Sequence, residues 1–256
     1  MANIVDERGY NQIFASSPAQ VLRLRRRAQA IIAALPLSIA TEERHTARIL
    51  ELGCGTGELA HELAVLTEAQ VTGVDLSERF IAQARQDYRR PNLDFIVADL
   101  TREVPAADQD RYHAITGNGI LHHLYYHLDV VLPALHRWLR PGGRLVFWEP
   151  NLWNPYVWTI FSLAPFRRLA KLETGEMAFT SRFIRSKLER AGFTGVEIAT
   201  RDFLLPNTPE ALIRPVVALG DRLDRIPVVN RLAQSLFFSA EKPLNPAPNP
   251  DFSHLN

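Results

Sequence analysis

ILELGCGTGELA, residues 49–60, is the stretch that decides the fold of this 256-residue chain. A short apolar run enters a glycine-rich segment, and helix-forming residues follow directly. Glycine lets the backbone turn sharply, so a ligand can approach the main-chain N–H groups at the start of a helix. The stretch predicts a strand, a tight turn and a helix around a nucleotide-like cofactor. A purely structural turn is the alternative.

Residues 46–151 alternate between short apolar runs and helical segments. The expected strands are nearly continuous apolar runs, as is typical of parallel strands buried on both faces, and they cover 49–52, 71–74, 93–97, 112–116 and 144–148. The helices between them begin at about residue 58, at Ser77 and after Asp129. Two later strands are expected at 196–200 and 235–240. This order predicts an α/β fold with right-handed crossovers.

The spacing of the glycines narrows the class of cofactor. A G-x-G-x-G pattern is formed by Gly53, Gly55 and Gly57. A dinucleotide-binding fingerprint has its third glycine or alanine one position later, where Glu58 stands. Asp75 ends the second strand and can accept from ribose hydroxyls, as in NAD-binding proteins. Asp99 ends the third strand and can accept from an adenine amino group, which disfavours a nicotinamide-dependent oxidoreductase.

The chain resembles the class I S-adenosylmethionine-dependent methyltransferases over residues 46–151. The resemblance lies in the order and spacing of ILELGCGTGELA, VTGVDLSERFIAQAR, FIVADL, ITGNGILHHL and LRPGGRLVFWEPN. It implies a Rossmann-like, mostly parallel seven-stranded sheet flanked by helices, with an antiparallel last strand. S-adenosylmethionine would lie across the carboxyl ends of the strands, as in other open α/β sheets. His113 departs from the family, which usually carries an aspartate there.

The resemblance also assigns cofactor-binding residues position by position. The implied set is Glu51, Gly53, Cys54, Gly55, Gly57, Asp75, Leu76, Asp99, Leu100 and Asn118. Glu51 and the glycine loop would hold the methionine part. Asp75 would bind the ribose, and Leu76 would lie beside the adenine. Asp99 would bind the adenine amino group, and Leu100 would pack nearby. Asn118 would face the methionine amino group or the sulfonium.

His122 and His123, which follow the fourth strand, are the candidate catalytic residues. Methyl transfer is an in-line displacement, so a general base is needed only when the acceptor is a hydroxyl or another protonated group. Histidine titrates near neutral pH and suits that role. The alternative is that both only pack or hydrogen-bond there. No metal site is expected, because no third ligand stands at suitable spacing.

Two segments that break the alternating pattern, at about 151–179 and 204–232, are expected to form helical lids. Trp153, Tyr156 and Trp158 in the first are the candidate acceptor-binding residues, and basic residues follow them. An apolar patch rimmed by positive charge suits a partly apolar acceptor that bears an acid or phosphate. It equally suits a peripheral contact with a membrane surface. The remaining alternative is that these aromatic side chains only pack the lid onto the domain.

The chain is expected to divide into an N-terminal helical cap at 1–45, a methyltransferase domain at 46–242 and a mobile, proline-rich tail at 243–256. A helix over about 19–35 carries a basic run of Arg23, Arg25, Arg26 and Arg27. The preferred interpretation is a solvated face, and the lesser one is contact with an anionic membrane or substrate. Tyr10 and Phe14 are candidates to fold over the cofactor.

Composition bounds the function further. The formal net charge of +1 gives no case for a nucleic-acid partner, and the single cysteine excludes an internal disulfide. Without a signal-like or membrane-spanning run, a cytoplasmic protein is expected. The expected activity is methylation of a small, partly apolar molecule, at oxygen or alternatively at carbon. A non-catalytic partner subunit is the main alternative, and the oligomeric state is not predicted.

Overall fold

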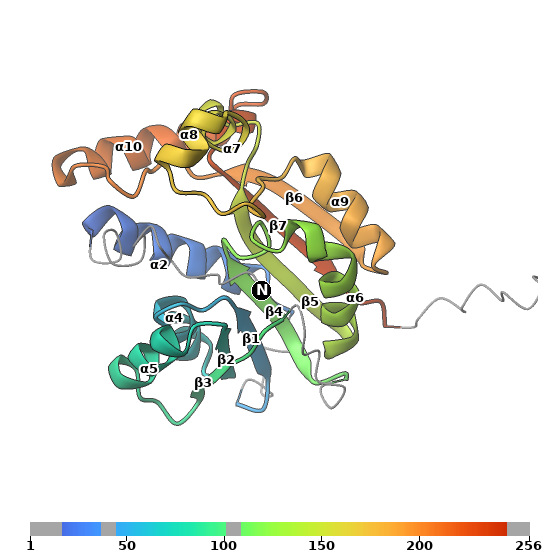
Figure 1. Cartoon of the computed structure of the whole chain (residues 1–256). Coiled ribbons are helices and arrows are strands. Elements are labelled where there is room, and N and C mark those ends of the chain that lie inside the picture. Colours follow the sequence, from blue (N-terminus) through green and yellow to red (C-terminus); the bar gives the residue numbers. More distant parts are fainter. Residues whose placement is uncertain (1–16, 37–44, 101–108, 245–256) are drawn as a thin grey trace, which may run out of the picture.

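The computed structural model of the chain describes residues 17–36, 45–100 and 109–244. Seven strands in these residues form one sheet in the order β3-β2-β1-β4-β5-β7-β6 (Figure 1). Their bounds are β1 (Arg48–Leu52), β2 (Gln70–Asp75), β3 (Leu93–Val97), β4 (Tyr112–Asn118), β5 (Leu139–Pro150), β6 (Thr194–Arg201) and β7 (Ser235–Glu241). Only β7 is antiparallel to its neighbours, β5 and β6. This Rossmann-like sheet confirms the predicted fold class.

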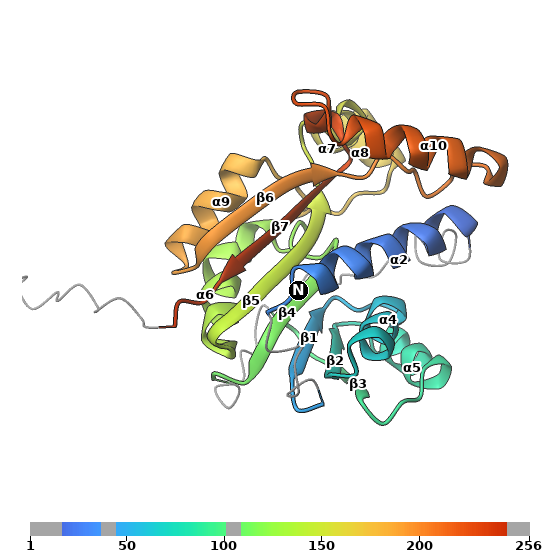
Figure 2. The ribbon, with the colours of Figure 1, turned by 180° about the vertical axis from the view of Figure 1, so that it is seen from behind.

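Helices cover both faces of the sheet because its strands carry apolar side chains on both. In β5, Leu145 and Phe147 pack into one core with α6 (Leu128–Trp138) and α9 (Ser181–Arg190). Val146 and Trp148 pack into the opposite core, which includes α2 (Pro18–Ala33), α4 (Glu58–Thr67) and α5 (Glu78–Asp87). Successive side chains of a strand point to opposite faces. This alternation produces the layers visible in Figures 1 and 2.

Two helical segments form a cap at one end of the molecule (Figures 1 and 2). The first contains α7 (Pro155–Ser162) and α8 (Ala164–Leu169), and the second contains α10 (Glu210–Leu223) and the 3-10 helix η3 (Asn230–Leu232). Asn154 Nδ2 donates to the carbonyl of Leu232 at 2.6 Å and Asn151 Nδ2 to that of Ala233 at 2.7 Å. The predicted lid insertions are therefore helical and joined to each other.

The domain boundaries stay a prediction. Tyr10, Phe14 and the tail from residue 245 onward lie outside the described residues.

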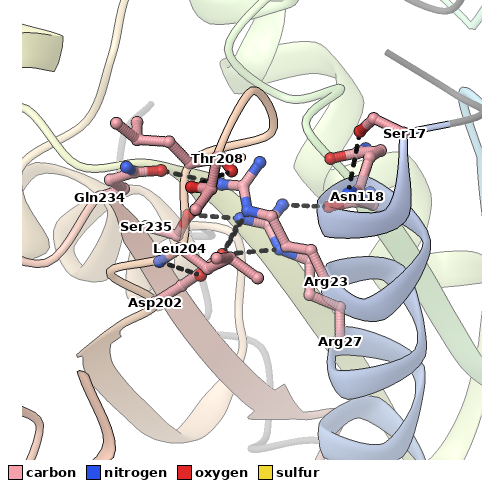
Figure 3. A network of polar contacts seen from close by, with 11 residues as sticks. Ser17, Arg23, Arg27, Asn118, Asp202, Leu204, Thr208, Gln234 and Ser235 are labelled. Carbon is pink, nitrogen blue, oxygen red and sulfur yellow. Dashed lines mark hydrogen bonds and ion pairs between the residues drawn. The ribbon is translucent and has the colours of Figure 1, made fainter. Parts of the chain in front are cut away.

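Two arginines of α2 face inward, which corrects the predicted solvated face. Arg23 and Arg27 are 8% and 9% exposed, whereas Arg25 and Arg26 are exposed as expected. Asp202, directly after β6, accepts from Arg23 Nε at 2.6 Å and from Arg27 Nη2 at 2.8 Å (Figure 3). Burial favours a raised pKa for Asp202, but the two arginines outweigh it and hold the pKa below its ordinary value. This network fastens α2 to the sheet.

Replacing Asp202 by asparagine is expected to lower the free energy of unfolding by about 2–3 kcal/mol, because a carboxylate is removed from two nearly buried guanidinium groups. Urea unfolding measures the loss. The matched control is Asp221→Asn, because Asp221 binds Arg26 of the same helix at 2.5 Å while both side chains are 45% exposed. Its expected loss is under about 1 kcal/mol. Equal losses would contradict a stabilising buried network.

Candidate active site

A cavity of about 900 Å³ lies at the carboxyl ends of the central strands. Ligands of open α/β sheets bind where the strand order reverses, which in this sheet is between β1 and β4. The predicted cofactor residues that line the cavity are Glu51, Gly53, Cys54, Gly55, Asp75, Leu76, Asp99, Leu100 and Asn118. Gly57 does not line it and instead precedes α4 as its N-cap. The fold thus gathers residues spread over β1 to β4.

The turn after β1 requires glycine at two positions. Gly53 and Gly57 have φ angles of 61° and 91°, in the left-handed region that strains other residues. A Cβ on Gly53 would lie 2.6 Å from Ile120, and one on Gly57 would lie 2.7 Å from Phe95. Both substitutions would therefore force neighbouring side chains to shift, and the one at Gly53 would displace Ile120, which lines the cavity.

Asp75 holds this turn against the end of β2. Its carboxylate accepts from the N–H groups of Gly55 and Ser77, each at 2.9 Å. Burial raises the pKa of Asp75, although these backbone donors oppose the shift. A carboxylate has about four acceptor positions, so two remain for further donors such as vicinal hydroxyls. Asp75 therefore both shapes the loop and can bind a ligand.

Glu51 gives the cavity an unpartnered buried acceptor. The residue is 2% exposed, and its Oε2 atom has no hydrogen-bond partner among the described residues. Burial raises its pKa, and the nearby carboxylates of Glu58 and Asp75 add to the shift. Such a concentration of acidic groups favours a cationic ligand. S-adenosylmethionine carries both a sulfonium and an ammonium group, so the residues present fit it.

Two other predicted cofactor residues have restricted roles. Burial, with the charges of Glu51 and Asp75, raises the pKa of the Cys54 thiol, which therefore stays protonated and is no nucleophile. Asn118 ends β4, and its Oδ1 accepts from Arg27 Nη1 at 2.5 Å (Figure 3). Arg27 uses one lone pair of this oxygen, so the second lone pair and the amide nitrogen of Asn118 remain for a ligand. No local pattern in the sequence links α2 with this residue, because Arg27 and Asn118 are 91 positions apart.

His122 lies in the cavity wall and is oriented by Glu149, at the end of β5. The Glu149 carboxylate accepts from the N–H groups of Ile120, Leu121 and His122, at 2.7–3.2 Å. It also lies 2.9 Å from His122 Nδ1. Both residues are buried, at 6% and 1% exposure. A carboxylate at Nδ1 favours the tautomer that carries its proton there, so Nε2 is left as a proton acceptor.

Glu149 is a site residue that sequence reasoning missed, and Glu176 is another. Glu176 is fully buried, and its Oε1 lies 2.9 Å from His123 Nδ1 without the alignment of a hydrogen bond. The ligand atoms of His122, His123 and Glu176 lie within 4.8 Å of one another, close enough for these groups to be considered as metal ligands. The absence of a metal site was predicted because no third ligand stands at suitable spacing in the sequence. The fold brings Glu176 beside the two histidines from a distant loop.

The lid presents a different set of side chains to the cavity from the one predicted. Tyr156 lines it, but Trp153 and Trp158 do not; they are 64% and 48% exposed at the surface. The apolar residues of α7 that do line it are Val157, Ile160 and Phe161. They recur at helical spacing from Val157, which is the signal that could have found them.

The lid is also bound directly to the histidine segment. The N–H of Met177 donates to the carbonyl of His122 at 3.1 Å. Arg167 is half-buried and donates to the carbonyls of Phe161 at 2.8 Å and Glu173 at 3.0 Å, so it folds the lid rather than rimming a pocket.

Comparison with known proteins agrees with this geometry. Residues 49–143 match the family model described as a methyltransferase domain. The solved structure of an S-adenosylmethionine-dependent methyltransferase from Mesorhizobium loti is 25% identical, covers 85% of this chain and 99% of its own, and superimposes with a TM-score of 0.60. Residues 49–143 therefore carry a methyltransferase domain, and the fold of the chain is similar to that of an S-adenosylmethionine-dependent methyltransferase. The Mesorhizobium protein depends on S-adenosylmethionine, and the acidic groups in the cavity of this chain fit the cationic groups of that cofactor.

The sequence relatives of this chain differ in what they act on. Demethylmenaquinone methyltransferase from Chlorobaculum parvum is 33% identical over 122 residues, which are 48% of each chain. Trans-aconitate 2-methyltransferase from an Azoarcus species is 36% identical over 130 residues, 49% of this chain and 46% of that one. The chain thus spans about half the length of the curated relatives it matches. No helix among the described residues is long and apolar enough to cross a membrane.

Proposed function

We propose that this chain transfers the methyl group of S-adenosylmethionine to a small, partly apolar molecule, at an oxygen or carbon atom that must lose a proton. The observation that supports this most is the buried His122–Glu149 pair in the wall of the cofactor cavity. The relatives named above act on small molecules. Oxygen is the preferred acceptor atom, because a hydroxyl group loses its proton to a histidine base more readily than a C–H group does.

When bound, S-adenosylmethionine supplies an activated methyl group, so the chain itself has to position the acceptor and remove its proton. Val157, Ile160 and Phe161 give the acceptor an apolar wall that excludes water. His122 Nε2 takes the proton, and Glu149 stabilises the imidazolium that forms. Positioning alone contributes about 7–11 kcal/mol in well-oriented reactions, and a general base adds about 10²–10⁴-fold.

The rate of methyl transfer is expected to fall in acid, below pH 6.5. Burial and the neighbouring His123 lower the pKa of His122 from its ordinary 6.5, although Glu149 opposes the shift. The neutral base is therefore present at pH 7, and activity is lost as the pH falls through this lowered pKa. Initial rates with saturating substrates across about pH 5–8 measure it. A rate that rises toward acid would contradict a histidine base.

The direct test is a screen of hydroxylated and enolisable small molecules with release of S-adenosylhomocysteine as the readout. Turnover of at least one class is expected, and mass spectrometry of the product identifies the methylated atom. Cofactor binding without turnover of any acceptor would favour the non-catalytic partner subunit.

The cluster of His122, His123 and Glu176 makes metal-assisted transfer a second candidate. Only that mechanism requires that turnover is lost after chelation and recovers when metal is added.

A further inference from the structure

The cap carries an unusual share of the exposed apolar side chains. Of the twenty large hydrophobic residues exposed in the described parts of the chain, twelve belong to 151–179 or 205–232. We call the exposed side chains of these two segments the cap surface. The most prominent are Trp153, Tyr156, Trp158, Leu169, Leu219 and Val228, with exposures from 48% to 80%. A concentration of exposed apolar side chains in two neighbouring segments is typical of an interaction site rather than of an ordinary solvated surface.

The same surface is strongly basic, although the chain as a whole has a net charge of only +1. Its exposed cations are Arg168, Lys171, Arg214, Arg222, Arg225 and Arg231. Its exposed acidic side chains are Glu210 and Asp221, and Asp221 is paired with Arg26. Charge complementarity therefore requires an anionic partner. It disfavours a second copy of the chain, because a twofold interface would press these cations against one another.

Tryptophan, tyrosine and leucine beside arginine and lysine are the composition of helices that lie in a lipid headgroup layer. Figures 1 and 2 place α7, α8 and α10 together at one end, so a flat surface can contact them at once. We propose that the cap surface docks this chain on an anionic lipid bilayer. Each basic side chain near such a surface adds attraction, and the apolar side chains enter the headgroup layer.

Docking would place the active site at the membrane. Tyr156 and Leu205 are exposed in the cap surface and also line the cavity, so the cap forms part of the cavity wall. An acceptor dissolved in the bilayer could then reach the cavity without crossing water. This consequence rests on the proposed function, whereas docking itself does not.

The test is co-sedimentation of the full chain with phosphatidylglycerol-containing vesicles and with pure phosphatidylcholine vesicles. Binding to the anionic vesicles that weakens with salt is expected. Arg168→Glu together with Arg214→Glu should weaken it roughly 30-fold or more, because each cation contributes about 1 kcal/mol. Leu169→Ser with Leu219→Ser should weaken it about tenfold or more. The matched control is Arg89→Glu with Arg90→Glu, two exposed cations outside the cap surface, which should leave binding unchanged.

Equal binding to both vesicles, no binding to either, or an equal loss in the control variant would overturn the proposal. Retention on immobilised polyglutamate without vesicle binding would assign the cap surface to an acidic protein and also overturn it. S-adenosylmethionine affinity measured on the same samples separates the two claims. Vesicle binding without cofactor binding refutes the proposed function alone, and cofactor binding without vesicle binding refutes docking alone.

Discussion

Replacing His122 by glutamine is expected to lower the maximal rate of methyl transfer by about 10²–10⁴-fold, the range that a positioned general base contributes. Glutamine fills a similar volume and can still donate to Glu149, which lies 2.9 Å from the Nδ1 atom of the native histidine. What it removes is the proton acceptor at Nε2. Initial rates with saturating cofactor and acceptor measure the effect, and calorimetry should show unchanged affinity for S-adenosylmethionine.

His123→Gln is the matched comparison, because His123 adjoins His122 with 4.2 Å between the ring centroids. Its side chain contacts Glu176 rather than Glu149, so a smaller loss is expected. If His123→Gln is the more damaging change, the base is assigned to the wrong histidine. Full activity in both variants would remove the general-base mechanism. The acid limb of the pH profile should disappear only in the variant that has lost the base.

Replacing Asp75 by alanine is expected to weaken S-adenosylmethionine binding by about 2–4 kcal/mol, or roughly 30- to 1,000-fold in the dissociation constant. Asp75 is expected to offer the ribose a charged acceptor, and a hydrogen bond to a charged group is worth about 1.5–3 kcal/mol. The N–H groups of Gly55 and Ser77 also lose their common acceptor. The loop that shapes the cavity floor should therefore loosen as well. Isothermal titration calorimetry measures the change.

Asp87→Ala is the control for a carboxylate lost from the same region. Asp87 ends α5, is exposed and accepts from Gln83 Nε2 at 2.7 Å. Its replacement should leave cofactor affinity unchanged. Asp75→Asn separates charge from shape, since it retains one acceptor oxygen and should give an intermediate loss. Unchanged affinity in Asp75→Ala would refute the assignment of the cavity to this cofactor.

Local patterns were sufficient to predict the sheet. Each strand is a short apolar run, and each helix has apolar residues at its own period, so both can be recognised without knowing their neighbours. The glycines at 53 and 57 are visible for the same reason, because the backbone angle they permit is a property of the residue itself. The placement of Asp75 and Asp99 follows from the rule that parallel strands end at the same edge.

Burial depends on distant partners and was harder to predict. Arg23 and Arg27 resemble solvated residues in the sequence, because their partner Asp202 comes 175 or more positions later. Trp153 and Trp158 resemble pocket residues only because they are aromatic, yet both are exposed at the surface. The residues of α7 that face the cavity include Val157 and Phe161. A helix can turn either face inward, and only the packing of Val157 and Phe161 with Ala178 selects the inward face of α7.

By itself, therefore, the sequence determined the Rossmann-like sheet, its glycine turn and the acidic strand ends that point to S-adenosylmethionine. The tertiary structure alone decided the rest: that Glu149 orients His122, that Glu176 stands beside His123, and that Asp202 draws two arginines of α2 inward. The reason is physical. Backbone preferences and hydrophobic periods act over a few residues, whereas hydrogen bonds and ion pairs join whichever side chains the packed sheet brings together.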